Sequence, residues 1–142
     1  GAAIISPVDA KTVENSRNFG RELGTAFQIV DDILDFTGDQ AAVGKPVGSD
    51  LLQGLITLPA LYYIEANPND EKVKSLLNGN YHNSKEIAAL VEDIRNSDAI
   101  QLALDEAKEY ANRALQSLNG HPPSEERHAL EKLTQYVTNR NV

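Results

Sequence analysis

A run of aspartates inside an otherwise apolar segment is the feature that most constrains this chain. Residues 27–35 read FQIVDDILD, which sets Asp31, Asp32 and Asp35 among phenylalanine, isoleucine, valine and leucine. We interpret the segment as a helix, because its apolar side chains fall at helical spacing. With about 3.6 residues per turn, Gln28, Asp31 and Asp35 share one stripe, and Asp32 lies beside it. The sequence therefore predicts a largely buried helix that carries several carboxylates on one side.

Carboxylates in such surroundings point to cation binding. An unpaired carboxylate is costly to bury, so it requires a cation, a hydrogen bond or a proton. Mg²⁺ prefers oxygen ligands and is commonly held by one or two carboxylates together with substrate phosphates. The alternative is a solvated acidic helix face, which a bare DDxxD pattern alone would favour. The apolar neighbours favour a cavity in which Asp31, Asp32 and Asp35 bind Mg²⁺.

A loop is predicted after the aspartates, because residues 37–50 contain four glycines and prolines. Lys45 lies in this loop, where it can fold back over the aspartates and pair with a phosphate as a point charge. An ordinary connector with an exposed lysine is the alternative. Asp50, at the end of the loop, is expected to cap the next helix.

These segments together resemble a known family. FQIVDDILDFTGD, followed by GKPVGSDL and then TLPAL, resembles the second aspartate-rich region of the trans-polyprenyl diphosphate synthases. The similarity continues upstream at residues 20–24, and downstream at residues 110–115 and 130–140. Nearly all 142 residues can be placed on the C-terminal half of such an enzyme.

The resemblance implies a prenyltransferase that condenses an allylic diphosphate with isopentenyl diphosphate, with Mg²⁺ assisting ionisation. It implies that Asp31 binds the metal directly, and that Asp32 and Asp35 bind it directly or through its water. It also implies that Lys45 pairs with the diphosphate of the substrate. The expected catalytic residues are Asp31, Asp32, Asp35 and Lys45, and the expected substrate-binding residues are Gln28, Lys45 and Asp50.

Parts of the family pattern are missing or altered. The family's first aspartate-rich motif and the basic residues for isopentenyl diphosphate lie N-terminal to the matched region, and no second DDxxD occurs here. Many members carry a lysine shortly before Thr-Leu-Pro, where this chain has Leu55. We therefore expect a fragment or processed product that supplies half of an active site and is inactive alone.

Charge and composition limit the classes of binding partner that this chain can have. A net charge of −8 disfavours nucleic acid and anionic membrane surfaces, and means that a diphosphate needs Mg²⁺ as a bridge. The absence of cysteine excludes disulfides and thiolate chemistry. No apolar stretch is long enough for a transmembrane helix. We expect a cytoplasmic protein that forms a homodimer in its full-length form.

The pattern predicts helices throughout and no strand. We expect one all-α domain over residues 1–142, an antiparallel helical bundle resembling the C-terminal half of the isoprenoid synthase fold. Gly20 and Gly24 predict that another helix passes close to the first one. The expected helices are 7–36, 51–66 with a break before Pro59, 71–77 capped by Asp70, one from Ser84, 98–118 and one capped by Ser124. The helix from Ser84 is expected to have Ile87, Leu90, Val91 and Ile94 on its apolar face. The expected buried positions are Val13, Gly20, Leu23, Phe27, Val30 and Leu34 in the first helix, and Leu130, Leu133 and Val137 in the last.

Two alternatives remain open. Terpene cyclases and head-to-head prenyl synthases also use aspartate-rich helices, although the TGD…GKPVGSDL continuation favours chain elongation. The other alternative is a non-catalytic partner subunit or a helical interaction module.

Overall fold

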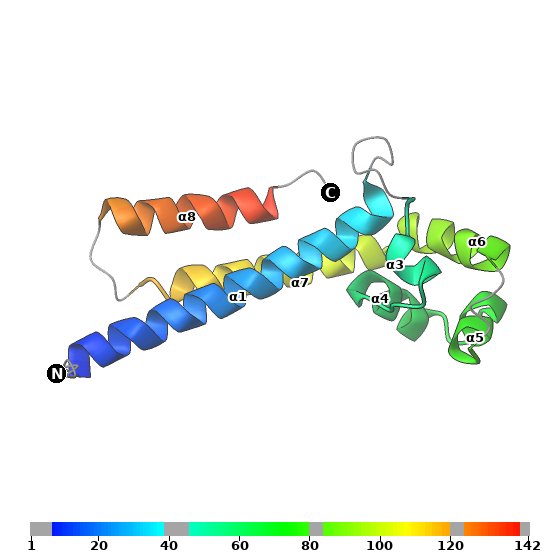
Figure 1. Ribbon diagram of the computed structural model, residues 1–142, viewed down its shortest axis with the longest axis horizontal. Coiled ribbons are helices and arrows are strands. Elements are labelled where there is room, and N and C mark those ends of the chain that lie inside the picture. Colours follow the sequence, from blue (N-terminus) through cyan, green and yellow to red (C-terminus); the bar gives the residue numbers. More distant parts are fainter. Residues whose placement is uncertain (1–6, 39–45, 80–83, 120–123, 140–142) are drawn as a thin grey trace. The chain divides into compact units, whose positions relative to one another are not determined.

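The computed structural model describes residues 7–38, 46–79, 84–119 and 124–139, and these parts are helical with no strand. The all-α prediction is therefore confirmed. None of the described helices is long and apolar enough to cross a membrane. The helices, shown in Figure 1, are α1 (Pro7–Thr37), α3 (Ser49–Leu52), α4 (Leu58–Ala66), α5 (Glu71–Leu77), α6 (Ser84–Arg95), α7 (Ala99–Gln116) and α8 (Glu125–Thr138).

The chain divides into two compact units. The first comprises residues 1–28 and 106–140, and the second comprises residues 29–105 with 141–142. The first unit therefore holds most of α1, the end of α7 and α8, and the second holds the end of α1, α3 to α6 and the start of α7. All the predicted site residues except Gln28 belong to the second unit.

The limits of α1 agree with the prediction, but its buried stripe agrees only in part, since Leu23 and Val30 are buried as predicted and other members are not. Val13 and Phe27, both predicted to be buried, are each 43% exposed, and Gly20 is also exposed. Residues 20, 27 and 34 of the predicted stripe each follow a buried residue by one position. One position is a rotation of about 100° around a helix, so these three residues lie to one side of the buried face. The buried side consists of Phe19, Leu23, Ala26, Ile29, Val30, Ile33 and Phe36.

The glycines of α1 do not mark a close helix crossing in the described structure. Apart from the two chain neighbours and the adjacent backbone of α1 itself, no atom of the described residues lies within 4 Å of a Cβ placed on Gly20 or Gly24. The prediction of a closely passing helix is therefore wrong for this part of the chain.

Helix α8 differs from its predicted orientation at one position. Leu133 is 46% exposed, whereas Thr134 is 2% and Val137 3% exposed. The Thr134 hydroxyl donates to the carbonyl oxygen of Leu130 at 3.0 Å, so its hydrogen bond is satisfied within the helix. This local bond lets a threonine take the buried place that the leucine was predicted to occupy.

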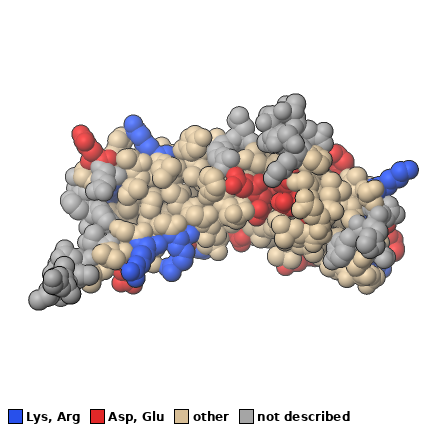
Figure 2. All heavy atoms as spheres, viewed as in Figure 1, with Lys and Arg blue, Asp and Glu red and all other residues tan. Residues whose placement is uncertain are grey.

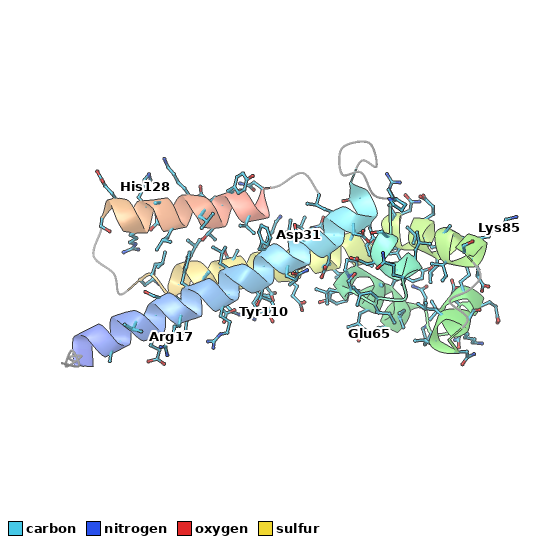
Figure 3. All side chains as sticks on the ribbon, viewed as in Figure 1. Arg17, Asp31, Glu65, Lys85, Tyr110 and His128 are labelled. Atoms are coloured by element: carbon cyan, nitrogen blue, oxygen red, sulfur yellow. The ribbon has the colours of Figure 1, made fainter. Side chains whose placement is uncertain are left out.

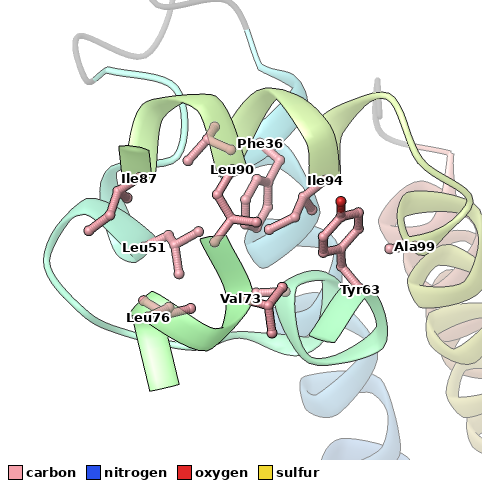
Figure 4. Packing of buried hydrophobic residues seen from close by; sticks show 11 residues of the cluster. Phe36, Leu51, Tyr63, Val73, Leu76, Ile87, Leu90, Ile94 and Ala99 are labelled. Carbon is pink, nitrogen blue, oxygen red and sulfur yellow. The ribbon is translucent and has the colours of Figure 1, made fainter. Parts of the chain in front are cut away.

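The core of the second unit surrounds α6 (Figure 4). The α6 residues Ile87, Leu90, Val91 and Ile94 are all buried, as the sequence predicts. Helix α6 packs against α3, α4 and α5, and Phe36 brings the end of α1 into the same cluster. Each large apolar side chain buried here contributes about 1.5–3 kcal/mol. This cluster therefore fixes the end of α1 relative to α3.

A polar network links α4, α5 and α6 beside that cluster. Asp70 caps α5, as predicted, because its carboxylate accepts from the backbone N–H of Lys72 at 2.8 Å. The Tyr63 hydroxyl donates to Asp70 at 3.3 Å, and the Lys72 ammonium pairs with Asp93 at 2.9 Å. Burial, followed by the charge of Asp70, raises the pKa of Tyr63, so this hydroxyl keeps its proton at neutral pH. The hydrogen bond that the Lys72 ammonium donates to Asp93 raises the pKa of Lys72.

Replacing Ile94 with alanine should lower the free energy of unfolding by about 2–5 kcal/mol, because it leaves a cavity at a fully buried position. Urea denaturation measures the loss. Leu77→Ala, at a side chain 57% exposed on α5, is the control and should change stability by less than about 0.5 kcal/mol. Equal losses in the two variants would contradict this description of the core.

Candidate functional site

The end of α1 carries the three aspartates on its less buried side. Val30, Ile33 and Phe36 are completely buried, whereas Asp31 and Asp35 are partly exposed. Figure 2 shows acidic side chains gathered over this part of α1, and Figure 3 labels Asp31 there. The apolar side thus anchors the helix and directs the carboxylates away from the core. The remaining two predicted residues on this helix are Asp32, which is partly exposed, and Gln28, which is exposed.

Asp35 joins the end of α1 to the start of α3. One carboxylate oxygen, Oδ1, accepts from the Ser49 hydroxyl at 2.7 Å, and the other, Oδ2, accepts from the backbone N–H of Asp50 at 3.1 Å. The carbonyl oxygen of Asp35 also accepts from the backbone N–H of Gly48 at 2.7 Å. We call these three hydrogen bonds the Asp35 clamp. They hold residues 48–50 against the last turns of α1.

The clamp supplies the cap that α3 lacks. The N-cap residue of α3 is Gly48, which has no side chain to accept from the first turn. Asp50 was predicted to cap this helix, but it lies within the first turn and so cannot act as its N-cap. The prediction is wrong because α3 begins two residues earlier than expected. The carboxylate of Asp35 accepts from the Asp50 N–H instead.

Gly48 is required here for two reasons. Its φ is +74°, in the left-handed region that other residues rarely adopt. A Cβ at this position would also lie 2.5 Å from both methyl groups of Val91 on α6. The start of α3 is therefore pressed against α6 at a point where no side chain fits.

Other predicted features of the site are only partly described. Lys45 lies outside the described residues, so its contact with a phosphate stays a prediction. Gln28, Asp31, Asp32 and Asp50 each interact with neighbouring groups. Within the described part of the chain, no three histidine, aspartate or glutamate side chains are gathered as a metal-binding group.

The segment after α3 stays close to Asp50. The backbone N–H of Leu55 donates to the carbonyl oxygen of Asp50 at 2.9 Å, and the Leu55 side chain is 57% exposed. Leu55 is therefore an exposed apolar residue whose backbone is bonded to that of Asp50. The predicted break is confirmed, because α4 begins at Leu58 with Pro59 in its first turn.

Two hollows are lined by described residues of the first unit. One, of about 270 Å³, lies on α8, and its Arg127 is already paired with Glu131 at 3.0 Å. The other, of about 230 Å³, lies between α7 and α8 and is lined by Lys108, Ala111, Asn112, Leu115, Thr134 and Gln135. Neither hollow brings together residues that the sequence predicts to be functional.

Sequence reasoning missed the roles of Gly48 and Ser49. Ser49 is 7% exposed, and its hydroxyl bonds to a residue fourteen positions earlier. The one available signal was Gly-Ser-Asp immediately before a predicted helix. That signal indicates a helix start but does not identify the distant acceptor.

Comparison with known proteins decides the family. The model of the polyprenyl synthetase family matches residues 1–94. The chain belongs to this polyprenyl synthetase family. Solanesyl diphosphate synthase 2, chloroplastic, from Arabidopsis thaliana is 38% identical to it over 140 residues, which is 99% of this chain and 33% of that protein. Heptaprenyl diphosphate synthase component 2 from Geobacillus stearothermophilus is 42% identical over 125 residues, covering 87% of this chain and 38% of that protein.

Solved polyprenyl synthetase structures share the fold. Heptaprenyl diphosphate synthase from Staphylococcus aureus matches 92% of this chain and 41% of its own, with a TM-score of 0.84 and 37% identity. A polyprenyl synthase from Caulobacter crescentus, complexed with calcium and isoprenyl diphosphate, matches 94% of this chain and 42% of its own, with a TM-score of 0.81 and 32% identity. The chain thus spans between a third and about two fifths of the length of these relatives.

Gly48→Ala should destabilise the protein more than Gly79→Ala does, which separates backbone strain from crowding. Gly79 also has a positive φ, of +82°, but nothing lies within 4 Å of its added Cβ. In both variants the left-handed backbone should lower the free energy of unfolding by about 1–2 kcal/mol. In Gly48→Ala, overpacking should lower it by about 1–3 kcal/mol more.

Chemical denaturation of both variants measures this difference. In a Val91→Ala background the additional loss at Gly48 should disappear, because the methyl groups that a Cβ would meet are gone. Equal losses at the two glycines in the wild-type background would contradict the close contact with α6.

Proposed function

We propose that this chain is the C-terminal portion of a trans-polyprenyl diphosphate synthase and supplies its second Mg²⁺–diphosphate half-site. The observation that carries the proposal is the aspartate pair Asp31 and Asp32, partly exposed on a helix whose other side is buried, in a chain of this family. The reaction joins an allylic diphosphate to isopentenyl diphosphate. The allylic carbon–oxygen bond breaks, diphosphate leaves, a new carbon–carbon bond forms, and a proton is lost.

The donor chemistry fits a hard cation. Carboxylate oxygens are the ligands that Mg²⁺ prefers, and one or two of them suffice when substrate phosphates complete the shell. When bound, Mg²⁺ supplies charge that stabilises the leaving diphosphate. Asp31 and Asp32 hold the metal from adjacent positions on α1. The same motif contains Asp35, whose two carboxylate oxygens already accept protein hydrogen bonds.

Three further residues serve the substrate in this proposal. Lys45 pairs with the diphosphate as a point charge. Gln28 orients a group beside the metal, one helical turn before Asp31. Asp50, whose backbone is held by Asp35, lies next to the substrate. The Caulobacter crescentus relative supports this chemistry, because that protein is complexed with calcium and isoprenyl diphosphate, and Ca²⁺ also takes oxygen ligands.

The chain alone is proposed to be inactive. Its 142 residues contain a single DDxxD motif, so the chain supplies one of the two aspartate-rich motifs that the full reaction uses. The full-length protein is proposed to be a cytoplasmic homodimer. A second candidate is a subunit of a heteromeric synthase, favoured by the Geobacillus stearothermophilus relative, which is named component 2 of its enzyme.

Asp31→Ala should abolish Mg²⁺-dependent diphosphate binding while preserving helicity, since alanine is the strongest helix former. Calorimetric titration of inorganic diphosphate, with and without Mg²⁺, measures binding, and circular dichroism measures helicity. Glu14→Ala is the control, because it removes the same charge from an exposed position on the same helix and should leave binding unchanged. Unaltered affinity in Asp31→Ala would remove Asp31 from the site.

Leu55→Lys should strengthen diphosphate binding, on the order of threefold to tenfold, by adding a charge-assisted hydrogen bond. Leu55 is exposed, and its backbone is bonded to Asp50. The matched control is Leu77→Lys, which makes the same change at a side chain that is equally exposed, 57% in both cases. An equal gain in both variants would show a general charge effect rather than a local one.

A further inference from the structure

We infer that Asp35 is a positioning residue, whose carboxylate, with Ser49, fixes the start of α3, and not a metal ligand. The inference rests on the proposed function for the role of the metal. It rests on the described contacts for the role of Asp35. It also assigns Ser49, which the sequence did not single out, to the functional site.

Both carboxylate oxygens of Asp35 have protein donors. The Ser49 hydroxyl lies 2.7 Å from one oxygen and the Asp50 N–H lies 3.1 Å from the other, and these two donors come from consecutive residues. Together with the bond from the Gly48 N–H to the Asp35 carbonyl oxygen, they fix the orientation of the carboxylate. A metal ion that bound Asp35 would have to compete with these donors.

Helix α3 depends on this arrangement. It has four residues, which is far too short to form a stable helix by itself. Its N-cap Gly48 provides no side-chain acceptor, and the carboxylate of Asp35 provides one from outside the helix. Leu51 then points into the core cluster and is fully buried.

The clamp also joins two parts of the chain that are distant in sequence. Asp35 lies near the end of α1, and Ser49 and Asp50 lie at the start of α3, so the clamp holds the start of α3 at the end of α1. The backbone of Asp50 is thereby fixed before a ligand binds. Asp35 thus acts on the diphosphate through Asp50 rather than by touching the metal.

Asp35→Asn separates the two roles. The asparagine Oδ1 can accept from the Asp50 N–H while its Nδ2 donates to the Ser49 hydroxyl, which accepts as well as donates. This variant keeps the shape of the clamp and removes the charge that a metal ligand needs. Asp31→Asn removes the charge at the proposed ligand.

Two measurements on the whole chain test the inference: Mg²⁺-dependent diphosphate affinity by calorimetry, and hydrogen exchange of the Asp50 amide by NMR. The diphosphate affinity of Asp35→Asn should lie within about threefold of the wild-type affinity, whereas that of Asp35→Ala should be about tenfold weaker. Amide exchange at Asp50 should accelerate in Asp35→Ala but not in Asp35→Asn. Ser49→Ala should lose less diphosphate affinity than Asp35→Ala and should accelerate Asp50 exchange less. Ser49→Thr retains the hydroxyl, so its affinity and its exchange rate should be those of the wild type.

The opposite results are equally informative. A loss of binding in Asp35→Asn as severe as in Asp31→Asn would make Asp35 a metal ligand and overturn the inference. Unchanged Asp50 exchange in Asp35→Ala would also overturn it, because the clamp would then not hold α3. If the wild-type chain shows no Mg²⁺-dependent binding, the proposed function fails, and the exchange results still decide the clamp.

Discussion

The burial of one side of α1 is the constraint on which the candidate site depends. Val30, Ile33 and Phe36 are completely buried, and Phe36 belongs to the core cluster around α6. Because side chains three and four positions apart share a helix face, burying these residues leaves little freedom for the positions between them. The rotation of α1 about its axis, and with it the direction of Asp31 and Asp32, is set by apolar packing rather than by the carboxylates themselves.

Hydrogen bonding then determines how the chain leaves this helix. The Asp35 clamp, with Gly48 in a left-handed conformation against Val91, fixes α3 at the end of α1. Gly48 and Asp35 have complementary roles in this arrangement. The glycine allows close approach but cannot cap a helix, and the aspartate caps from a distance.

Features governed by neighbouring residues were predictable from the sequence. Asp70 and Ser124 were recognised as caps, and both accept from backbone N–H groups within three residues. The buried face of α6 was also predicted, because Ile87, Leu90, Val91 and Ile94 form one uninterrupted apolar stripe. Local spacing carries enough information in these cases.

Features governed by distant contacts were not predictable. On α1, apolar residues occur on more than one side, and the neighbours that select the buried side come from elsewhere in the chain. Phe27 was therefore placed inside although it is 43% exposed. The same limit applies to the bond between Asp35 and Ser49, because fourteen residues separate donor and acceptor. For the site, the sequence identified the aspartate helix, but it could not show which carboxylate serves the fold.

The charge balance of the chain bears on how the proposed half-site would work. The net charge is −8, and the position where many family members carry a lysine holds the exposed Leu55. A diphosphate approaching this surface meets like charge, which in water is repulsive over about 10 Å at moderate salt. A divalent cation reverses the sign of that interaction at the carboxylates. With fewer basic side chains to share the phosphate charge, diphosphate binding at the proposed half-site would depend more steeply on Mg²⁺ than in a relative that has the lysine.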